Sequence, residues 1–336
     1  MTVVTAHPGA EVPIVPVEAH FLLSDECPRG CAVCPFPTNG RAALDIADRF
    51  AVIDRLDALD IRHLLLIGLG SHNITGSAET VAHGLELGLS VDLYVLGTMP
   101  DASLWPTLAA APPAHVLFEI LGDRRRHDAM AGEGSFDEII AAIAAAANAG
   151  LEVGTVLPVL VGSEDLHTTL PTQFPSGIKG MVVQHYIPFL PGQQVYAAGE
   201  AESVALWRRL SDAMPDHLVL YASCARSPVP GVSKVCSAGR YKLSIAADGT
   251  VIPCEHFRGS EAALGNILTD DFEAIWSAPL LSDVRDPAAY ALDETCAVCD
   301  SRHQCSGCRA AGYNHYGDAR RVLPVCLPAD ALGLRE

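Results

Sequence analysis

Two spacings of apolar residues alternate along the first 213 residues of the chain. Apolar residues recur at helical spacing within 42–59, where Ile46, Phe50, Ile53 and Leu56 share one face. Further helices are expected at 77–87, 102–110, 135–150 and 203–213. Short apolar runs with the length of buried strands lie at 17–23, 63–67, 91–96, 115–121, 152–159 and 181–189. This alternation predicts an α/β fold whose six units form a partial (β/α)6 TIM-like barrel, with a parallel sheet inside and helices outside.

Local signals mark the ends of individual elements. Ser135 and Glu138 have the spacing of a capping box at the start of an Ala-rich helix, and Gly150 follows its end. Gly68-Leu69-Gly70-Ser71 follows the second strand as a glycine turn. We therefore expect helix and strand ends at these positions.

The character of the chain changes near residue 223. From Cys224 onward it contains eight of the eleven cysteines, many turn residues and little sustained periodicity. This composition predicts a small second domain that is stabilised more by metal than by an apolar core. We expect a leader at 1–16, the partial barrel at 17–222 and the cysteine-rich domain at 223–336.

Composition narrows the classes of function. The 336 residues are 49% hydrophobic, contain no apolar run of membrane-spanning length, and begin without a signal-peptide pattern, which predicts a cytoplasmic protein and no membrane partner. Forty acidic residues against 22 basic ones give a net charge of −18, which argues against a nucleic-acid partner. This balance suits a cationic substrate, or simply reflects an acidic surface. In a reducing compartment, the cysteines favour metal binding over disulfides.

Cys27, Cys31 and Cys34 follow the first predicted strand in a loop rich in glycine and proline. Three closely spaced thiolates can hold three irons of a 4Fe-4S cluster and leave the fourth iron open to a small molecule. A zinc loop or a redox pair is the alternative, although structural zinc sites usually have four ligands. The spacing therefore indicates the reactive end of an iron–sulfur enzyme.

These residues resemble a known enzyme family across nearly the whole chain. The three-cysteine loop after the first strand of a partial barrel resembles radical S-adenosylmethionine (SAM) enzymes. The second half resembles their SPASM extension, in which Gly249 precedes a cysteine by five positions and the last group differs from the usual pattern by one residue between Cys305 and Cys308. The cysteines that match this extension are Cys236, Cys254, Cys296, Cys299, Cys305, Cys308 and Cys326.

The resemblance implies three 4Fe-4S clusters, one that binds SAM and two auxiliary ones, with flavodoxin or ferredoxin as the reductant. By family analogy, one auxiliary cluster takes Cys224, Cys236, Cys254 and Cys308, and the other takes Cys296, Cys299, Cys305 and Cys326. Cys224 is either the eighth ligand or a buried spectator. Taken alone, the last group of cysteines also fits a zinc ribbon, but the total number of cysteines argues for two clusters.

The resemblance also suggests SAM contacts. Family members often carry Gly-Gly-Glu-Pro after the second strand, where this chain has Gly68, Gly70, Ser71 and His72 and lacks the acid. The glycines permit close approach of the backbone to the ligand, and Ser71 or His72 is expected to replace the acid. Glu119, at the end of the fourth strand, is the candidate for the SAM ribose; an ordinary strand-end acid is the alternative.

Three further features are candidates for substrate contact. His185 and Tyr186, at the end of the sixth strand, are candidate catalytic residues, although a structural histidine is the simpler explanation of His185. The run 124–126 of three arginines suits a carboxylate or phosphate, or a solvated loop.

The resemblance implies SAM cleavage to a 5′-deoxyadenosyl radical that abstracts hydrogen, and leaves the outcome open. Only 26 residues precede Cys27, which favours a small substrate, such as an amino sugar or aminocyclitol of natural-product biosynthesis. The leading hypothesis is a dehydrogenase that oxidises an alcohol to a ketone while an auxiliary cluster accepts an electron. The alternatives are an epimerase or decarboxylase of a sugar nucleoside, a peptide maturase, and a non-catalytic metal-binding interaction protein.

Overall fold

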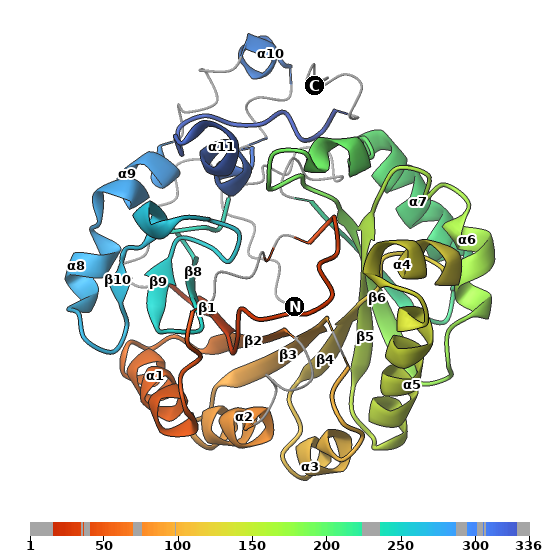
Figure 1. The fold of residues 1–336 in the computed structure, drawn as a ribbon, viewed down its shortest axis with the longest axis horizontal. Coiled ribbons are helices and arrows are strands. Elements are labelled where there is room, and N and C mark those ends of the chain that lie inside the picture. The colour runs from red at the N-terminus through yellow and green to blue at the C-terminus, as the bar shows by residue number, and fades with distance from the viewer. Residues whose placement is uncertain are drawn as a thin grey trace.

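One mixed sheet organises the chain (Figure 1). The computed structural model describes residues 16–34, 36, 41–69, 76–97, 99–223, 236–286, 294–300, 305 and 307–327. Within these ranges ten strands pair in the order β10-β9-β8-β1-β2-β3-β4-β5-β6-β7. β8 and β1 to β7 are parallel neighbours, whereas β9 and β10 pair antiparallel. The strands are β1 (Glu18–Leu22), β2 (His63–Leu69), β3 (Ser90–Leu96), β4 (His115–Glu119), β5 (Val153–Val159), β6 (Ile178–His185), β7 (Leu218–Ala222), β8 (Lys242–Ile245), β9 (Thr250–Ile252) and β10 (Gly265–Asn266).

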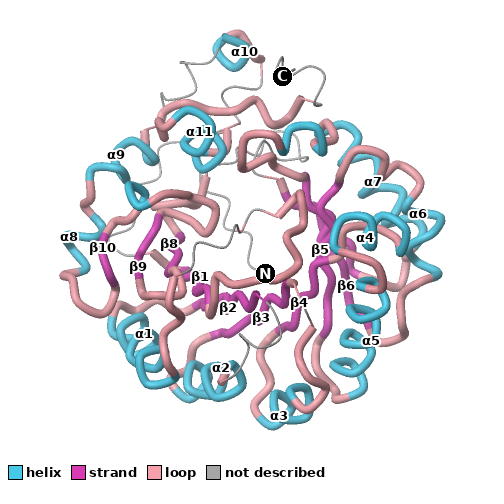
Figure 2. The backbone as a smooth tube through the Cα atoms, viewed as in Figure 1, coloured by secondary structure: helices cyan, strands magenta, loops and turns pink. Residues whose placement is uncertain are grey.

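Helices cover the outer side of the arc that β1 to β6 form, and the segment after β1 crosses its inner side (Figures 1 and 2). The helices of the first half are α1 (Ile46–Ala58), α2 (Ser77–Glu86), α3 (Leu104–Ala110), α4 (Arg124–Ala131), α5 (Ser135–Asn148), α6 (Leu166–Thr169), η2 (Leu170–Thr172), η3 (Gln193–Tyr196) and α7 (Glu200–Ala213). Those of the second half are η4 (Ser260–Ala262), α8 (Phe272–Trp276), α9 (Pro279–Arg285), α10 (Glu294–Ala297) and α11 (Arg309–Tyr316).

Side chains alternate between the two faces of the sheet. On β1, Ala19 and Phe21 are fully buried in the main apolar core, which also contains Val52 and Leu56 of α1. Because successive strand residues point to opposite faces, Glu18 and His20 point to the inner face. At β1 the sheet therefore buries its apolar face against helices and presents polar groups inside the arc.

The predicted partial barrel is confirmed, since all six predicted strands are present and each is followed by at least one helix. Four more strands, β7 to β10, were not predicted. β8 pairs with β1 in parallel, with Glu18 opposite Lys242, so the sheet continues into the second half of the chain. The boundary at 222/223 stays a prediction.

Two local predictions were wrong. The arginine run is not a solvated loop: it opens α4, where the Asp123 carboxylate accepts a hydrogen bond from the Arg126 backbone N–H at 3.1 Å. The N-cap of α5 is Gly134 in a left-handed conformation (φ +81°), so Ser135 does not cap the helix. Its hydroxyl donates to Asp128 at 3.1 Å instead, and this carboxylate from the preceding helix also accepts the Phe136 N–H of α5 at 2.8 Å. The end of α5 before Gly150 is as expected.

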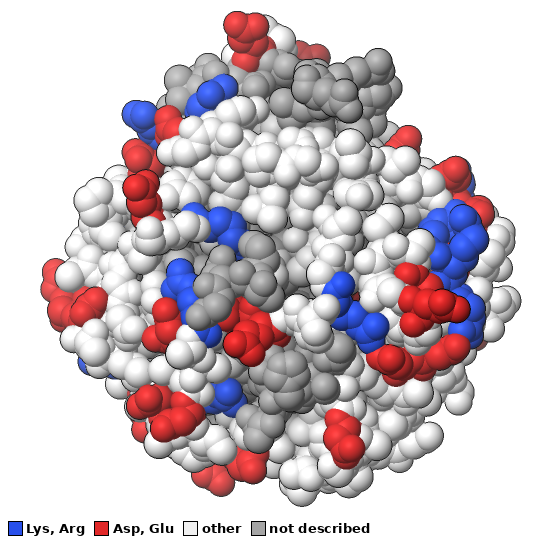
Figure 3. All heavy atoms as spheres, viewed as in Figure 1, with Lys and Arg blue, Asp and Glu red and all other residues white. Residues whose placement is uncertain are grey.

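No helix in the described ranges is long and apolar enough to cross a membrane. On the face shown in Figure 3, basic side chains lie beside acidic ones and form no continuous basic patch. This surface agrees with the net charge of −18.

Candidate functional site

The loop that follows β1 brings Cys27, Cys31 and Cys34 to the carboxyl end of the parallel sheet. Gly30 adopts a φ of +61°, and the Cys34 N–H donates to the Cys31 carbonyl at 2.9 Å, so the loop turns tightly between its cysteines. Burial, with the nearby Cys27 charge, raises the pKa of the Cys31 thiol to about 11. A buried thiol loses its proton most readily when a metal binds it, and three neighbouring thiols on one loop therefore fit an iron–sulfur cluster.

Two side chains beyond β6 hold this loop in place. Gln193 Nε2 donates to the Cys34 carbonyl at 2.9 Å and to the Ala32 carbonyl at 3.3 Å, and its Oε1 accepts from Leu190 N–H at 3.1 Å. The Tyr186 hydroxyl donates to the Val33 carbonyl at 3.3 Å. Both side chains are buried. Tyr186 thus touches the backbone of the cysteine loop, and Gln193, which sequence reasoning missed, binds both ends of the Ala32–Cys34 segment.

Glu119 ends β4 beside the same loop. It is half-buried and accepts a hydrogen bond from the Tyr94 hydroxyl at 2.7 Å. Burial raises the pKa of Glu119, and its charge in turn contributes to raising the pKa of the Cys31 and Cys34 thiols. The predicted ribose-binding acid and the cysteine loop are therefore neighbours on the inner side of the sheet.

The other predicted SAM contacts divide between described and undescribed residues. Gly68 lies within β2, paired opposite Val95 of β3. Gly70, Ser71 and His72 lie outside the described residues. The contact that replaces the missing acid therefore stays a prediction.

His185 lies on the outer face of the sheet, fully buried. Its Nδ1 is 2.9 Å from the Ser203 hydroxyl of α7, and its Nε2 is 2.7 Å from the Val325 carbonyl. Both ring nitrogens therefore have protein partners, which favours the structural alternative over a catalytic role. The histidine ties β6 to the segment that contains Cys326.

The arginine run makes protein contacts. Arg124 pairs with Asp137 of α5, and Arg126 pairs with Asp123 at 2.8 Å and also with Asp165. These ion pairs tie α4 to neighbouring segments, so neither arginine supports the anion-binding interpretation.

The C-terminal cysteines lie in two neighbourhoods that share Cys326. Cys254 and Cys308 are buried in one apolar cluster, and both Cys236 and Cys326 pack against it. Burial, with the charges of Cys326 and Cys299 contributing, raises the pKa of the Cys305 thiol to about 11. The assignment of these cysteines to two separate clusters, which the family resemblance implies, stays a prediction.

Cys308 also begins α11, because its sulfur accepts the Ala311 N–H at 3.5 Å. Cys224 lies outside the described residues. Among the residues that are described, no group of three Cys, His, Asp or Glu side chains is placed to hold a single metal ion.

A buried charge network, not anticipated from the sequence, occupies the inner face between β1 and β8. The Glu255 carboxylate accepts hydrogen bonds from Lys242 Nζ at 3.1 Å and from the Ser244 hydroxyl at 2.9 Å, and His20 Nδ1 lies 3.1 Å from it. His20 also contacts Glu18. Burial opposes the charge of Glu255, but Lys242 and His20 hold its pKa well below the ordinary value. Polar residues alternating along 18–20 and 242–244 are the signal that could have revealed this network.

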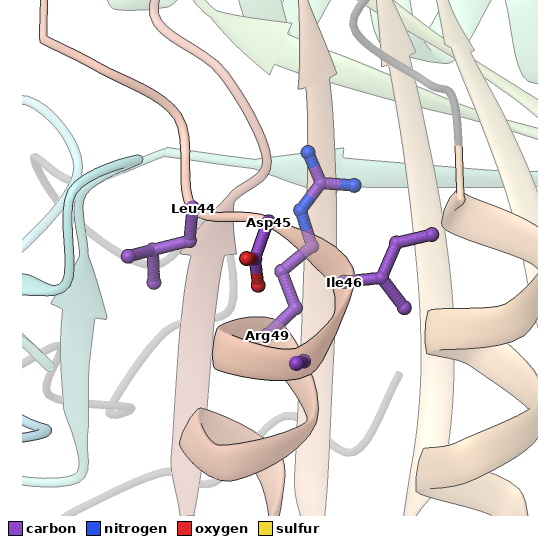
Figure 4. Close-up of a pocket in the computed structure, with 5 residues that line it drawn as sticks. Leu44, Asp45, Ile46 and Arg49 are labelled. Carbon is purple, nitrogen blue, oxygen red and sulfur yellow. The ribbon is translucent and has the colours of Figure 1, made fainter.

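A separate pocket of about 490 Å³ opens beside the first turn of α1 (Figure 4). Leu44, Asp45, Ile46 and Arg49 line it, and the Arg49 side chain extends away from the helix. Arg49 also donates to the Leu23 carbonyl at 3.3 Å, at the base of the cysteine loop. None of the three cysteines of that loop lines the pocket.

Comparison with known proteins agrees with this geometry. The iron–sulfur cluster-binding domain family SPASM matches residues 236–300. The AdoMet-dependent heme synthase of Nitratidesulfovibrio vulgaris is 26% identical over 283 residues, 74% of each chain. The enzyme of that name from Methanosarcina barkeri is 31% identical over 97 residues, which are 29% of this chain and only 26% of the relative's own length.

The fold is also similar to that of solved structures. Streptococcus suis SuiB bound to S-adenosylmethionine superposes with a TM-score of 0.76 at 16% identity, over 93% of this chain and 77% of SuiB. Residues 236–300 therefore match a SPASM iron–sulfur cluster-binding domain, and the three-cysteine loop on a partial barrel, together with these relatives, makes the chain similar to radical SAM enzymes.

Proposed function

We propose that this protein is a radical SAM oxidoreductase in which substrate binds inside the arc of the sheet, between the first cysteine loop and the segment after Cys254. One contact carries the proposal: the Phe36 ring, two residues beyond Cys34, lies 5.4 Å from the His256 ring, two residues beyond Cys254. The Phe189 ring stacks on the His256 ring, with 3.8 Å between the ring centroids. The two cysteine sites are thus joined through packed rings.

The residues that would hold the cofactors follow from the site. Cys27, Cys31 and Cys34 would hold the cluster that binds SAM, with Gly68 and Glu119 beside it. The two C-terminal neighbourhoods would hold two auxiliary 4Fe-4S clusters, with Cys224 completing the first. When bound, these groups supply a 5′-deoxyadenosyl radical that takes a hydrogen atom, and an acceptor for the second electron.

The residues of this chain position the cysteine loop and exclude water from its surroundings. Gln193 and Tyr186 fix the backbone of the cysteine loop by hydrogen bonds. The three thiols would therefore present a bound cluster in one orientation. Phe36, Ile67 and Leu96 form an apolar cluster against which Cys27 and Cys34 pack. Apolar side chains around the site would exclude water, so that a reactive intermediate reacts with the substrate and not with the solvent.

For the outcome, we propose oxidation of an alcohol to a ketone: the carbon loses a hydrogen atom and one electron, and the hydroxyl loses a proton. An amino sugar or aminocyclitol is the candidate substrate because the chain has a net charge of −18. A peptide is the second candidate, favoured by the similarity to SuiB, which has also been solved bound to its precursor peptide SuiA.

Deuterium transfer tests the proposal. Reconstituted enzyme with SAM, a strong reductant and a panel of carbon-deuterated alcohols and serine-containing peptides should yield labelled 5′-deoxyadenosine and a product about two mass units lighter than the unlabelled substrate. A product of unchanged mass indicates epimerisation, and loss of carbon dioxide indicates decarboxylation. Absence of SAM cleavage in fully reconstituted protein would contradict the enzyme proposal.

Iron analysis tests the ligand assignment. Three clusters require about twelve irons per chain. Replacing Cys27, Cys31 and Cys34 together by Ala should abolish SAM cleavage while roughly two thirds of the iron remains. Loss of all iron in this variant would show instead that the cysteines support the fold of the whole site.

A further inference from the structure

Arg258 lies between the two cysteine sites. Its guanidinium carbon is 5.7 Å from the centre of the Phe36 ring, and the charges of Cys254 and Cys34 both act on it. Nη1 donates to the carbonyls of Glu255 at 2.7 Å and Phe257 at 3.0 Å. These bonds and the ring fix the plane and the direction of the guanidinium.

The opposite edge of the Arg258 guanidinium has no partner among the described residues. Nε and Nη2 are buried and have no hydrogen-bond acceptor within the described part of the chain. Their N–H groups point the same way from one edge of the planar group, which is the fork that binds two oxygens of one anion. Buried donors are nearly always paired in folded proteins, so an unpaired fork calls for a ligand.

The acidic side chains Glu255 and Asp248 are already paired with groups other than the Arg258 guanidinium. The Glu255 carboxylate is taken by Lys242 and Ser244, and the nearby Asp248 is paired with Arg41 at 3.2 Å. Burial lowers the pKa of Arg258 to about 10, so the group still carries its charge at neutral pH. The region between the two cysteine sites therefore contains one cation whose best donors are unused.

We propose that the Arg258 fork binds a carboxylate of the substrate; this rests on the function proposed above and favours its second candidate, a peptide, because an amino sugar or aminocyclitol carries no carboxylate. A carboxylate presents two coplanar oxygens and one charge, matching one fork and one cation, whereas a phosphate dianion needs more donors than Arg258 offers. The residues expected to contact SAM, Gly68 and Glu119, lie on β2 and β4, whereas Arg258 enters with Cys254 beside β8 and β1. The carboxylate is therefore assigned to the substrate and not to SAM.

A matched pair of probes tests this assignment. Reconstituted holoenzyme saturated with SAM is mixed with N-acetylserine or N-acetylserinamide, which differ in the free carboxylate, at about 20 mM, and its thermal midpoint is measured without oxygen. The acid should raise the midpoint by about 2–5 °C and the amide should not. Arg258→Gln should lose the acid-specific shift, and Arg258→Lys should keep part of it. The control Arg41→Gln removes a neighbouring, already paired cation and should keep the whole shift.

Several results would overturn the proposal. Equal shifts from acid and amide, no shift from the acid, or an acid-specific shift that survives in Arg258→Gln all count against it. SAM affinity, measured by equilibrium dialysis beside decarboxylated SAM, should change less than about twofold in Arg258→Gln. A tenfold loss confined to SAM would place the SAM carboxylate on the fork instead. The wild-type assay for 5′-deoxyadenosine is separate, so failure of the proposed function is distinguishable from failure of this inference.

Discussion

The side chain of Gln193 offers a direct test of how the cysteine loop is positioned. It is 6% exposed and makes three hydrogen bonds, two of them to backbone carbonyls of the loop. Gln193→Ala removes all three and leaves the carbonyls of Ala32 and Cys34 without this donor. At about 1 kcal/mol for each bond, plus the cost of unpaired buried groups, the loop should lose about 2–4 kcal/mol of local stability.

Such a loss changes how often the loop opens. Because 1.4 kcal/mol corresponds to a factor of ten, the open fraction should rise roughly 30- to 700-fold. Iron bound by the loop should then pass faster to a ferrous chelator under anaerobic conditions, while about two thirds of the iron leaves at the wild-type rate. The measurement is the time course of chelation, beside urea unfolding of the same samples.

Gln194 provides the matched control. It lies next in the same 3-10 helix, is 8% exposed, and its Nε2 is 3.2 Å from His315 Nδ1 in the C-terminal half. Gln194→Ala should lower the free energy of unfolding without accelerating iron loss from the Cys27 loop. If both variants release iron alike, or Gln193→Ala behaves as wild type, the loop is not positioned by this side chain and the reasoning fails.

The fold was predictable wherever the signal is local. Apolar spacing placed the strands of the partial barrel and their helices, because periodicity reflects the one buried face of each element. The pairing of β8 with β1 was not predictable, since it joins Glu18 to Lys242 across most of the chain and leaves no local pattern. The capping-box prediction at Ser135 failed because the acceptor that replaces the cap, Asp128, belongs to the preceding helix and not to the predicted motif.

The residues of the candidate site also differ in whether the sequence alone reveals them. Cys27, Cys31 and Cys34 were recognisable because a cluster loop needs its ligands at short, regular spacing. Gln193 was not, because its partner Cys34 is 159 residues away and glutamine has no distinctive chemistry. Arg258 looked like any other charge in the sequence. Only the contacts of its Nη1, and the lack of partners along its other edge in the described part of the chain, set it apart.

Three further changes probe the second half of the chain. Cys224→Ser should lower the iron content if this residue is a ligand, and full iron content would remove it from the ligand set. In Gly312→Ala the new Cβ would lie 1.9 Å from the Arg321 carbonyl oxygen, so α11 must shift. The free energy of unfolding, measured by urea unfolding, should therefore fall by at least about 2 kcal/mol. Lys242→Met leaves the buried Glu255 carboxylate without its cation, and should lower the free energy of unfolding by about 3–5 kcal/mol. Adding Glu255→Gln removes the uncompensated charge, so the double variant should recover part of this loss in urea unfolding. Equal instability of the single and double variants would show that Lys242 acts through packing and not through its charge.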